Sequence, residues 1–126
     1  MPQTKDAKGR FMQKVLAADT LTGDTVVNRQ KEDLGKIEHL MIDVETGRVA
    51  YAVLSFGGFL GMGDKLFAIP WSALAIDTGE KQFILEVDKK SLESAPGFDK
   101  AHWPDMADRV WGAEVNKYYG AKPYWT

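Results

Sequence analysis

The chain has 126 residues, a net charge of −2 and no cysteine. This length suits one domain with a single core, and the lack of thiols excludes disulfides and thiolate metal sites. Net charge is +1 over residues 1–33, −3 over 34–96 and 0 over 97–126. Phosphate binding needs clustered Lys and Arg, so this even spread argues against a nucleic-acid partner.

Apolar runs in the sequence are short. None approaches the roughly 18 residues of a membrane span, and Val15–Ala18 is too short for the core of a signal peptide. We therefore expect a soluble, cytoplasmic protein with no membrane span.

The N-terminal residues 1–20 are expected to be loosely ordered, because residues 1–14 are polar and contain Pro2 and Gly9. Leu16–Leu21 is a candidate first short strand that ties this segment to the body. Thr25–Asn28 resembles a second strand, and a polar connection leads from it into the following hairpin.

Residues 34–56 predict two strands joined by a tight turn. The turn Asp43–Gly47 ends in glycine, which suits a left-handed position. Ile37 is apolar at an odd position, whereas Leu40 and Ile42 are apolar at even ones. Since a strand alternates strictly, this switch predicts a β-bulge near Glu38–His39.

The second strand of this hairpin is apolar on both faces, so both should be covered. Val49, Tyr51 and Val53 are expected on one face. The other face is expected to carry Ala50, Ala52, Leu54 and Phe56. One face would line a barrel interior, and the other needs a cover from elsewhere in the chain or from a second subunit.

The remaining pattern adds strands and then helices. A glycine-rich loop at 57–64 is expected to be mobile. Strands are predicted at 65–70, 74–77 and 82–87, with a helical turn at 71–74. A short helix over 88–94 begins at Asp88, and a longer one opens at Trp103–Asp105 and stops at Gly120.

The longer helix has one apolar face, formed by Ala107, Trp111, Val115 and Tyr118. Residues 97–126 hold half of the 14 aromatic residues of the chain. Aromatic side chains bury about 150–250 Å² each, so this segment must pack on something. The fold class is therefore mainly β: a small barrel of about six strands at 21–95, followed by an aromatic-rich helical extension at 96–126 that packs on it.

The hairpin residues and the Ala68-Ile-Pro-Trp71 segment that follows the glycine-rich loop resemble the PRC-barrel domain over residues 21–95. The extension, with Tyr118-Tyr-Gly and Pro-Tyr-Trp125, looks like that of stand-alone bacterial members. The domain is similar to the cytoplasmic part of the photosynthetic reaction-centre H subunit and to the C-terminal part of a ribosome maturation factor. The resemblance implies a PRC-type barrel without a catalytic signature.

Candidate catalytic and metal-binding residues are few. His39 and His102 are the only histidines, and Asp43 and Glu45 lack the spacing of a calcium loop. Three serines, Ser55, Ser72 and Ser91, have no nucleophile-elbow context, and residues 57–64 lack the Gly-Lys-Ser/Thr of a phosphate loop. Trp71 is interpreted as a plug at the end of the barrel. We expect no enzyme activity, no cofactor and no metal.

The candidate interaction surface consists of two parts. Phe59, Leu60 and Met62 form an apolar tip on the glycine-rich loop, and Trp111 and Tyr118 lie on the C-terminal helix. The leading hypothesis is a non-enzymatic interaction or assembly module with an unknown protein partner, which forms a homodimer through the loop tip. The alternatives are an RNA- or ribosome-associated assembly factor and a small-ligand-binding barrel.

Overall fold

The computed structural model describes residues 4–5, 15–57 and 65–126. Its strands are β1 (Thr4–Lys5), β2 (Thr25–Val27), β3 (Asp33–Asp43), β4 (Arg48–Phe56), β5 (Lys65–Pro70), β6 (Leu74–Asp77) and β7 (Gln82–Leu85). Its helices are the 3-10 helices η1 (Ala18–Thr20) and η2 (Trp71–Ala73) and the α-helices α1 (Lys89–Glu93) and α2 (Arg109–Tyr118). The mainly β fold is thus confirmed.

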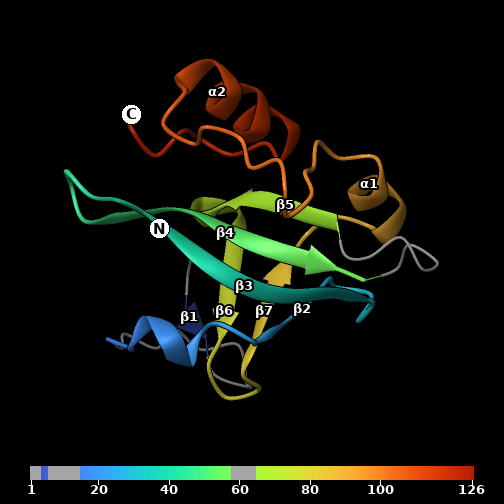
Figure 1. The fold of residues 1–126 in the computed structure, drawn as a ribbon. Coiled ribbons are helices and arrows are strands. Elements are labelled where there is room, and N and C mark those ends of the chain that lie inside the picture. The colour runs from blue at the N-terminus through green and yellow to red at the C-terminus, as the bar shows by residue number, and fades with distance from the viewer. Residues whose placement is uncertain (1–3, 6–14, 58–64) are drawn as a thin grey trace.

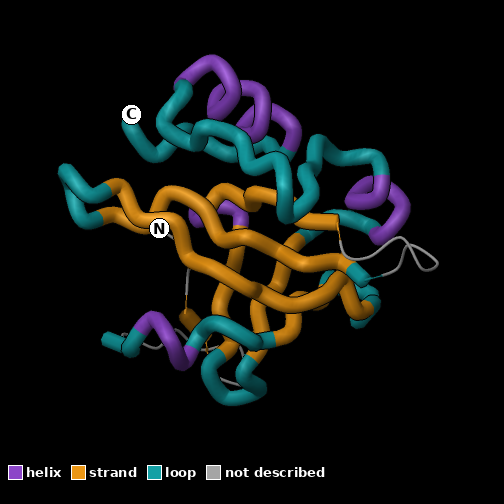
Figure 2. The backbone as a smooth tube through the Cα atoms, viewed as in Figure 1, coloured by secondary structure: helices purple, strands orange, loops and turns teal. Residues whose placement is uncertain are grey.

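The strands form one curled sheet in the order β1-β6-β7-β2-β3-β4-β5 (Figure 1). β3, β4 and β5 are joined antiparallel in sequence order, whereas β2 pairs with β7 in parallel. The sheet bends between the β3–β5 layer and the β6–β7 pair, which makes a half-barrel (Figure 2). η2 joins β5 to β6 as the predicted helical turn.

The β3–β4 hairpin contains the predicted bulge. The register of β3 against β4 shifts between Ile37 and His39, which leaves Glu38 as the extra residue. Gly47 closes the turn at φ +76° and donates its N–H to the Asp43 carbonyl at 2.8 Å, as the turn assignment requires. These two features give the hairpin its twist and its register.

A second bulge overturns part of the expected alternation in β4. The register also shifts where Ile42 faces Val49 and Met41 faces Tyr51, so Ala50 is the extra residue. Ala50 consequently joins Tyr51 in the outer cluster rather than the interior core. The expected grouping of Ala50 on one face with Ala52, Leu54 and Phe56 is wrong, because the bulge reverses the parity of the strand at that point.

The interior of the half-barrel is filled by apolar side chains from every long strand. Its largest fully buried members include Leu34, Ile37, Leu54, Phe67, Phe83 and Leu85. Leu92 of α1 and Ala95 pack into the same cluster. The hydrophobic burial of this layer is the main source of the stability of the sheet.

The outer face of β4 and β5 is covered by the C-terminal residues of the same chain, as expected. Ala50, Tyr51 and Ala68 of the sheet are buried together with Val115 of α2. Trp111, Tyr119 and Tyr124 pack against this cluster and are half-buried. α2 and the segment that follows it lie across the outer side of β4 and β5 (Figures 1 and 2).

The longer helix begins later than the sequence pattern predicts. Asp105 accepts the Ala107 N–H in a turn, and Asp108 caps α2 by accepting the Val110 N–H at 2.9 Å. Ala107 therefore lies outside the helix, and the inward face continues from Val115 to Tyr119 instead of Tyr118. Competition between two aspartates explains the error, since either can cap a helix.

Two other boundaries differ from the sequence expectation. Leu16–Leu21 contains η1 instead of a strand, because Leu21 donates to the Ala18 carbonyl and the Thr20 hydroxyl donates to the Ala17 carbonyl. β7 ends at Leu85, where the Val87 N–H turns back to the Leu85 carbonyl. The predicted cap of the short helix is confirmed, since Asp88 accepts the Ser91 N–H at 2.6 Å.

Candidate interaction surface

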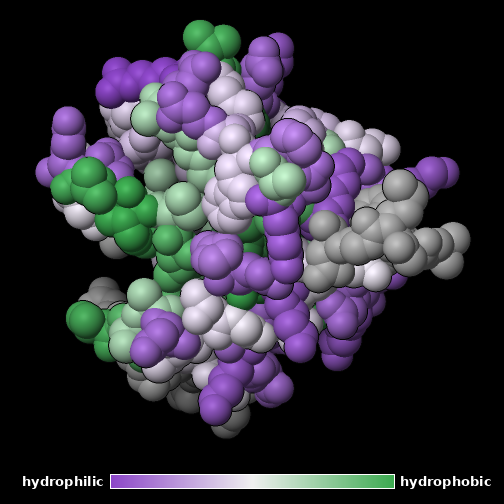
Figure 3. Space-filling view, viewed as in Figure 1, coloured by the Kyte–Doolittle hydropathy of each residue, from purple (hydrophilic) through white to green (hydrophobic). Residues whose placement is uncertain are grey.

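An apolar strip lies along the part of the β3–β4 hairpin that projects beyond the half-barrel. We call Leu40, Ile42 and Val44 the hairpin strip. Leu40 is half-buried against the interior core, Ile42 is 47% exposed and Val44 at the turn is 89% exposed. Figure 3 shows hydrophobic surface over this hairpin and a hollow on its side toward η1. The strip continues the interior face of the sheet past the point where the core covers it.

The backbone edge of β3 beside this strip is open among the described residues. β2 is in register with β3 at Asp33, Gly35 and Lys36 only. Ile37 makes the last contacts on that side, because its N–H donates to the Asp24 carbonyl and its carbonyl accepts the Gly23 N–H. Past Ile37, β3 is paired within the described chain through β4 alone.

The outer aromatic cluster is an internal layer rather than an open surface. Tyr51 is fully buried and meets Trp111 and Tyr124 edge-on, with ring centroids 5.3 and 5.9 Å away. Burial raises the pKa of Tyr51 to about 12. Tyr124 adds to this rise, and the nearby Asn116 amide opposes it. Its hydroxyl nevertheless meets no partner at hydrogen-bond geometry among the described residues; the amide of Asn116 donates to the Gly112 carbonyl instead.

Tyr119, which caps the C-terminus of α2, is in the same situation. Its hydroxyl is buried without a hydrogen bond among the described residues. Burial is the main cause that raises its pKa, and Tyr118 adds to it. A buried, unpartnered hydroxyl costs about 1–3 kcal/mol of desolvation, so both tyrosines contribute to stability through their rings.

The site residues predicted from the sequence fall into two groups. Phe59, Leu60 and Met62 lie outside the described residues. Trp111 is half-buried against Tyr51, and Tyr118 is 40% exposed with its hydroxyl bonded to the Ser91 carbonyl. Sequence reasoning did not single out the hairpin strip, although the period-two run Leu40, Ile42, Val44 was visible as its signal.

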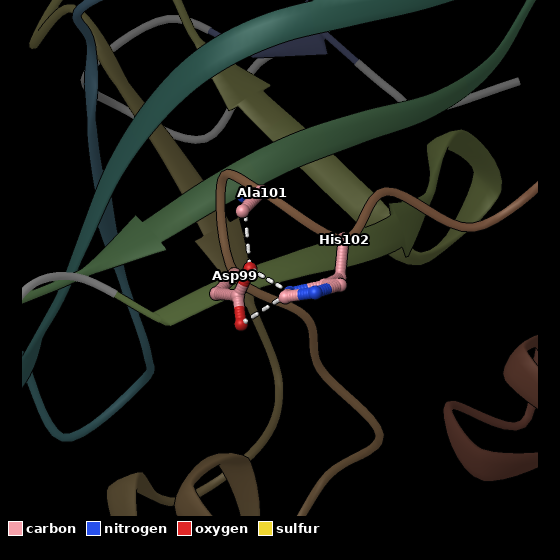
Figure 4. Close-up of polar contacts among 3 residues, drawn as sticks. All are labelled: Asp99, Ala101 and His102. Carbon is pink, nitrogen blue, oxygen red and sulfur yellow. Dashed lines mark hydrogen bonds and ion pairs between the residues drawn. The ribbon is translucent and has the colours of Figure 1, made fainter.

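Each of the two histidines contacts a nearby side chain. His102 Nδ1 lies 2.8 Å from Asp99 Oδ1, which also accepts the Ala101 N–H (Figure 4). These bonds, chiefly the one from His102, lower the pKa of Asp99. The pair is largely exposed and orders the turn after Phe98. His39 meets Trp103 edge-on at 5.5 Å.

The described residues contain no group of three or more His, Asp or Glu arranged to hold a metal ion. No helix in this part of the chain is long and apolar enough to cross a membrane.

A hollow of about 670 Å³ lies between the start of β4, η2 and the C-terminal residues. Arg48, Trp71, Asn116 and Tyr124 are among its lining residues, and Arg48 is held there by the Tyr124 carbonyl at 2.8 Å. Trp71 packs against the interior core, with its ring 6.0 Å from that of Phe83. This position fits the expected plug, so the hollow lies outside the interior of the half-barrel.

The comparisons with known proteins address the fold. A solved structure described as a 16S ribosomal RNA processing protein, RimM, from Pseudomonas aeruginosa is 20% identical to this chain, with a TM-score of 0.41. The match covers 60% of this chain and 45% of that one, so the chain spans less than half of that protein. No curated protein matches significantly. The family model described as the PRC-barrel domain matches residues 13–92, more than half of the chain. The curled sheet and this match together show that the chain belongs to the PRC-barrel domain family.

Proposed function

We propose that the chain is a non-enzymatic protein-interaction or assembly module. The observation that carries this proposal is the hairpin strip, which exposes Ile42 and Val44 on the β3–β4 hairpin. Single exposed apolar residues are ordinary, but a contiguous apolar patch marks a contact surface. Burial of one such side chain is worth about 1.5–3 kcal/mol.

The same chain covers its other apolar sheet face, which strengthens this reading of the strip. The C-terminal residues bury Tyr51 and Ala68 on the outer side of β4 and β5. Among the described residues, no segment does the same for Ile42 or Val44. An outside partner is therefore the natural cover for the strip.

The polar groups support a non-enzymatic role. Asp88 and Asp108 cap helices, and Asp99 orders a turn with His102. Catalytic groups normally converge in a recess with shifted pKa values. The clearest upward shifts belong to Tyr51 and Tyr119, whose hydroxyls are enclosed by packing.

Affinity capture with the tagged full chain tests the proposal. A partner protein that the wild type captures should be missing from the capture with the double variant Ile42→Ser/Val44→Ser. The matched control is Val110→Ser, which alters a 72% exposed apolar residue on α2 and should retain it. Equal capture by all three proteins would refute a role for the strip.

RNA binding is tested in parallel, because it separates the ribosome-associated alternative from the proposal. We expect no RNA binding that depends steeply on salt. A loss of affinity by orders of magnitude between low and moderate salt would favour that alternative, since counterion release governs phosphate contacts.

A further inference from the structure

The free edge of β3 is less protected than the edge that β5 forms at the end of the described sheet. On the far side of β5, Leu66 and Phe98 exchange two backbone hydrogen bonds, at 2.9 and 2.8 Å, and Pro70 ends the strand. These features close that edge against further pairing. The stretch from His39 to Asp43 has no proline and no lysine. The extra residue of β3 itself, Glu38, lies before this stretch, and the extra residue of the second bulge, Ala50, belongs to β4.

The ladder determines which backbone groups of this edge are available. In an antiparallel ladder, successive residues point their N–H and C=O alternately toward and away from the partner strand. Ile37 points away from β4, because it bonds to Gly23 and Asp24. Once the extra residue Glu38 is passed, His39 and Met41 face β4, and the backbone groups of Leu40 and Ile42 point outward.

We propose that this edge pairs antiparallel with the same edge of a second copy of the chain, with the two-fold axis at Met41. The inference rests on the proposed function and names its partner. An antiparallel pair of identical strands is related by a two-fold axis, so one open edge supplies both halves of a closed dimer. Pairing would join two half-barrels into one continuous sheet.

The residue order across the axis is complementary. With Met41 opposite Met41, Leu40 of one copy faces Ile42 of the other, so two apolar pairs form on the strip side. On the opposite face, His39 of one copy faces Asp43 of the other. Leu40 and Ile42 are also the residues whose backbone groups point outward, so each facing pair exchanges two hydrogen bonds.

Single cysteines test the contact and its register, because the chain has no cysteine of its own. Met41 would form a non-hydrogen-bonded pair with a Cα separation of about 4.5 Å, which lies within disulfide range. Under oxidation, Met41→Cys should therefore cross-link into a dimer more completely than Leu40→Cys or Ile42→Cys. Val110→Cys, on an exposed site of α2, is the control and should stay uncrosslinked.

Sedimentation at micromolar concentration tests the association without cross-linking. The wild type should dimerise, and Ile42→Lys should raise the dissociation constant at least about tenfold, because each dimer would bury two new charges. Val110→Lys is the matched control and should leave it unchanged. A wild type that is monomeric at tens of micromolar overturns the proposal.

Other outcomes also overturn it. The proposal fails if the dimer persists in Ile42→Lys but dissociates in Phe59→Ser/Leu60→Ser. It also fails if a cysteine at another position cross-links more completely than Met41→Cys. If the protein is monomeric and the backbone amides of Leu40 and Ile42 are protected from hydrogen exchange, another part of the same chain pairs with this edge. If the protein is monomeric but capture still depends on Ile42 and Val44, the proposed function stands and only the second copy is rejected.

Discussion

Gly112 is a point of close approach between α2 and the sheet, and it allows the outer layer to be tested quantitatively. A Cβ at this position would lie 2.6 Å from the Tyr51 hydroxyl and 2.9 Å from two ring atoms of Trp125. Carbon atoms prefer separations of about 3.5–4.0 Å. Alanine would gain roughly 1 kcal/mol over glycine in helix propensity, but overpacking costs about 1–3 kcal/mol.

We therefore expect Gly112→Ala to lower the free energy of unfolding by about 1 kcal/mol, although an exposed helix would be stabilised by the same change. Tyr51→Phe alone should be neutral or stabilise by up to about 1 kcal/mol, because it removes a buried hydroxyl without a partner. In the double variant, the closest contact of the new methyl group disappears, so the two changes should couple favourably by about 1 kcal/mol.

Urea denaturation of the wild type, the two single variants and the double variant measures this double-mutant cycle. The midpoints are compared where the urea dependence of the free energy of unfolding is the same for all four proteins. Tyr119→Phe supplies the control, because its hydroxyl is also buried without a hydrogen bond but is not among the atoms nearest to position 112. It should combine additively with Gly112→Ala. A Gly112→Ala variant more stable than the wild type, or equal coupling with both tyrosines, would refute the packing argument.

Three further outcomes are expected. Because the pKa of Tyr51 is raised in the folded protein, its phenolic proton is lost at a lower pH in the unfolded chain. The free energy of unfolding should therefore be unaffected below about pH 10 and fall by roughly 2 kcal/mol by pH 12. Tyr51→Phe should reduce this fall in a series of urea midpoints measured at different pH, and an unchanged fall would contradict the assignment. Gly47→Val should destabilise the protein by about 1 kcal/mol or more because Gly47 has a positive φ, although no atom lies within 4 Å of a Cβ built at this position. Gly47→Asn should cost less, and equal decreases in melting temperature for the two variants would argue against backbone strain. Truncation after Pro96 should give an aggregating product, since Tyr51 and Ala68 lose their cover; a monomer with an unchanged melting temperature would show that the outer layer is dispensable.

Local rules allowed much of the fold to be predicted. The parity switch between Ile37 and Leu40 predicted the bulge at Glu38, and the glycine at the end of the turn predicted the positive φ of Gly47. Both signals arise from residues within a few positions of each other. Asp88 as a helix cap belongs to the same class.

The errors occurred where the sequence offers two equivalent solutions. Ala50 is small enough for either face of β4, so its parity gives no sign of the second bulge. Asp105 and Asp108 can each begin a helix, and tertiary packing of Trp111 and Val115 favours the later start. Tyr118 and Tyr119 are adjacent aromatics, and only the position of α2 on the sheet decides which one turns inward.

The candidate surface required three-dimensional information for a different reason. Apolar residues that alternate along β3 on either side of the bulge at Glu38 predict one buried face, and for Ile37 and Leu40 that prediction agrees with their packing. The same pattern continues to Ile42 and Val44, although the hairpin has by then passed beyond the interior core. A sequence pattern gives the face of a strand but not the length over which the core covers it.

The placement of the C-terminal residues also bears on where the chain can associate with itself. From the sequence, one face of β4 needed a cover from elsewhere in the chain or from a second subunit. The structure fills that face with Val115 and its aromatic neighbours from the same chain. The hairpin strip combines exposed side chains with an open backbone edge, and the two reinforce each other, since strand pairing aligns the strip of one copy with that of the other. An interface there leaves Val115 and its neighbours on the outer face, and Met41 at its axis packs against that same outer cluster.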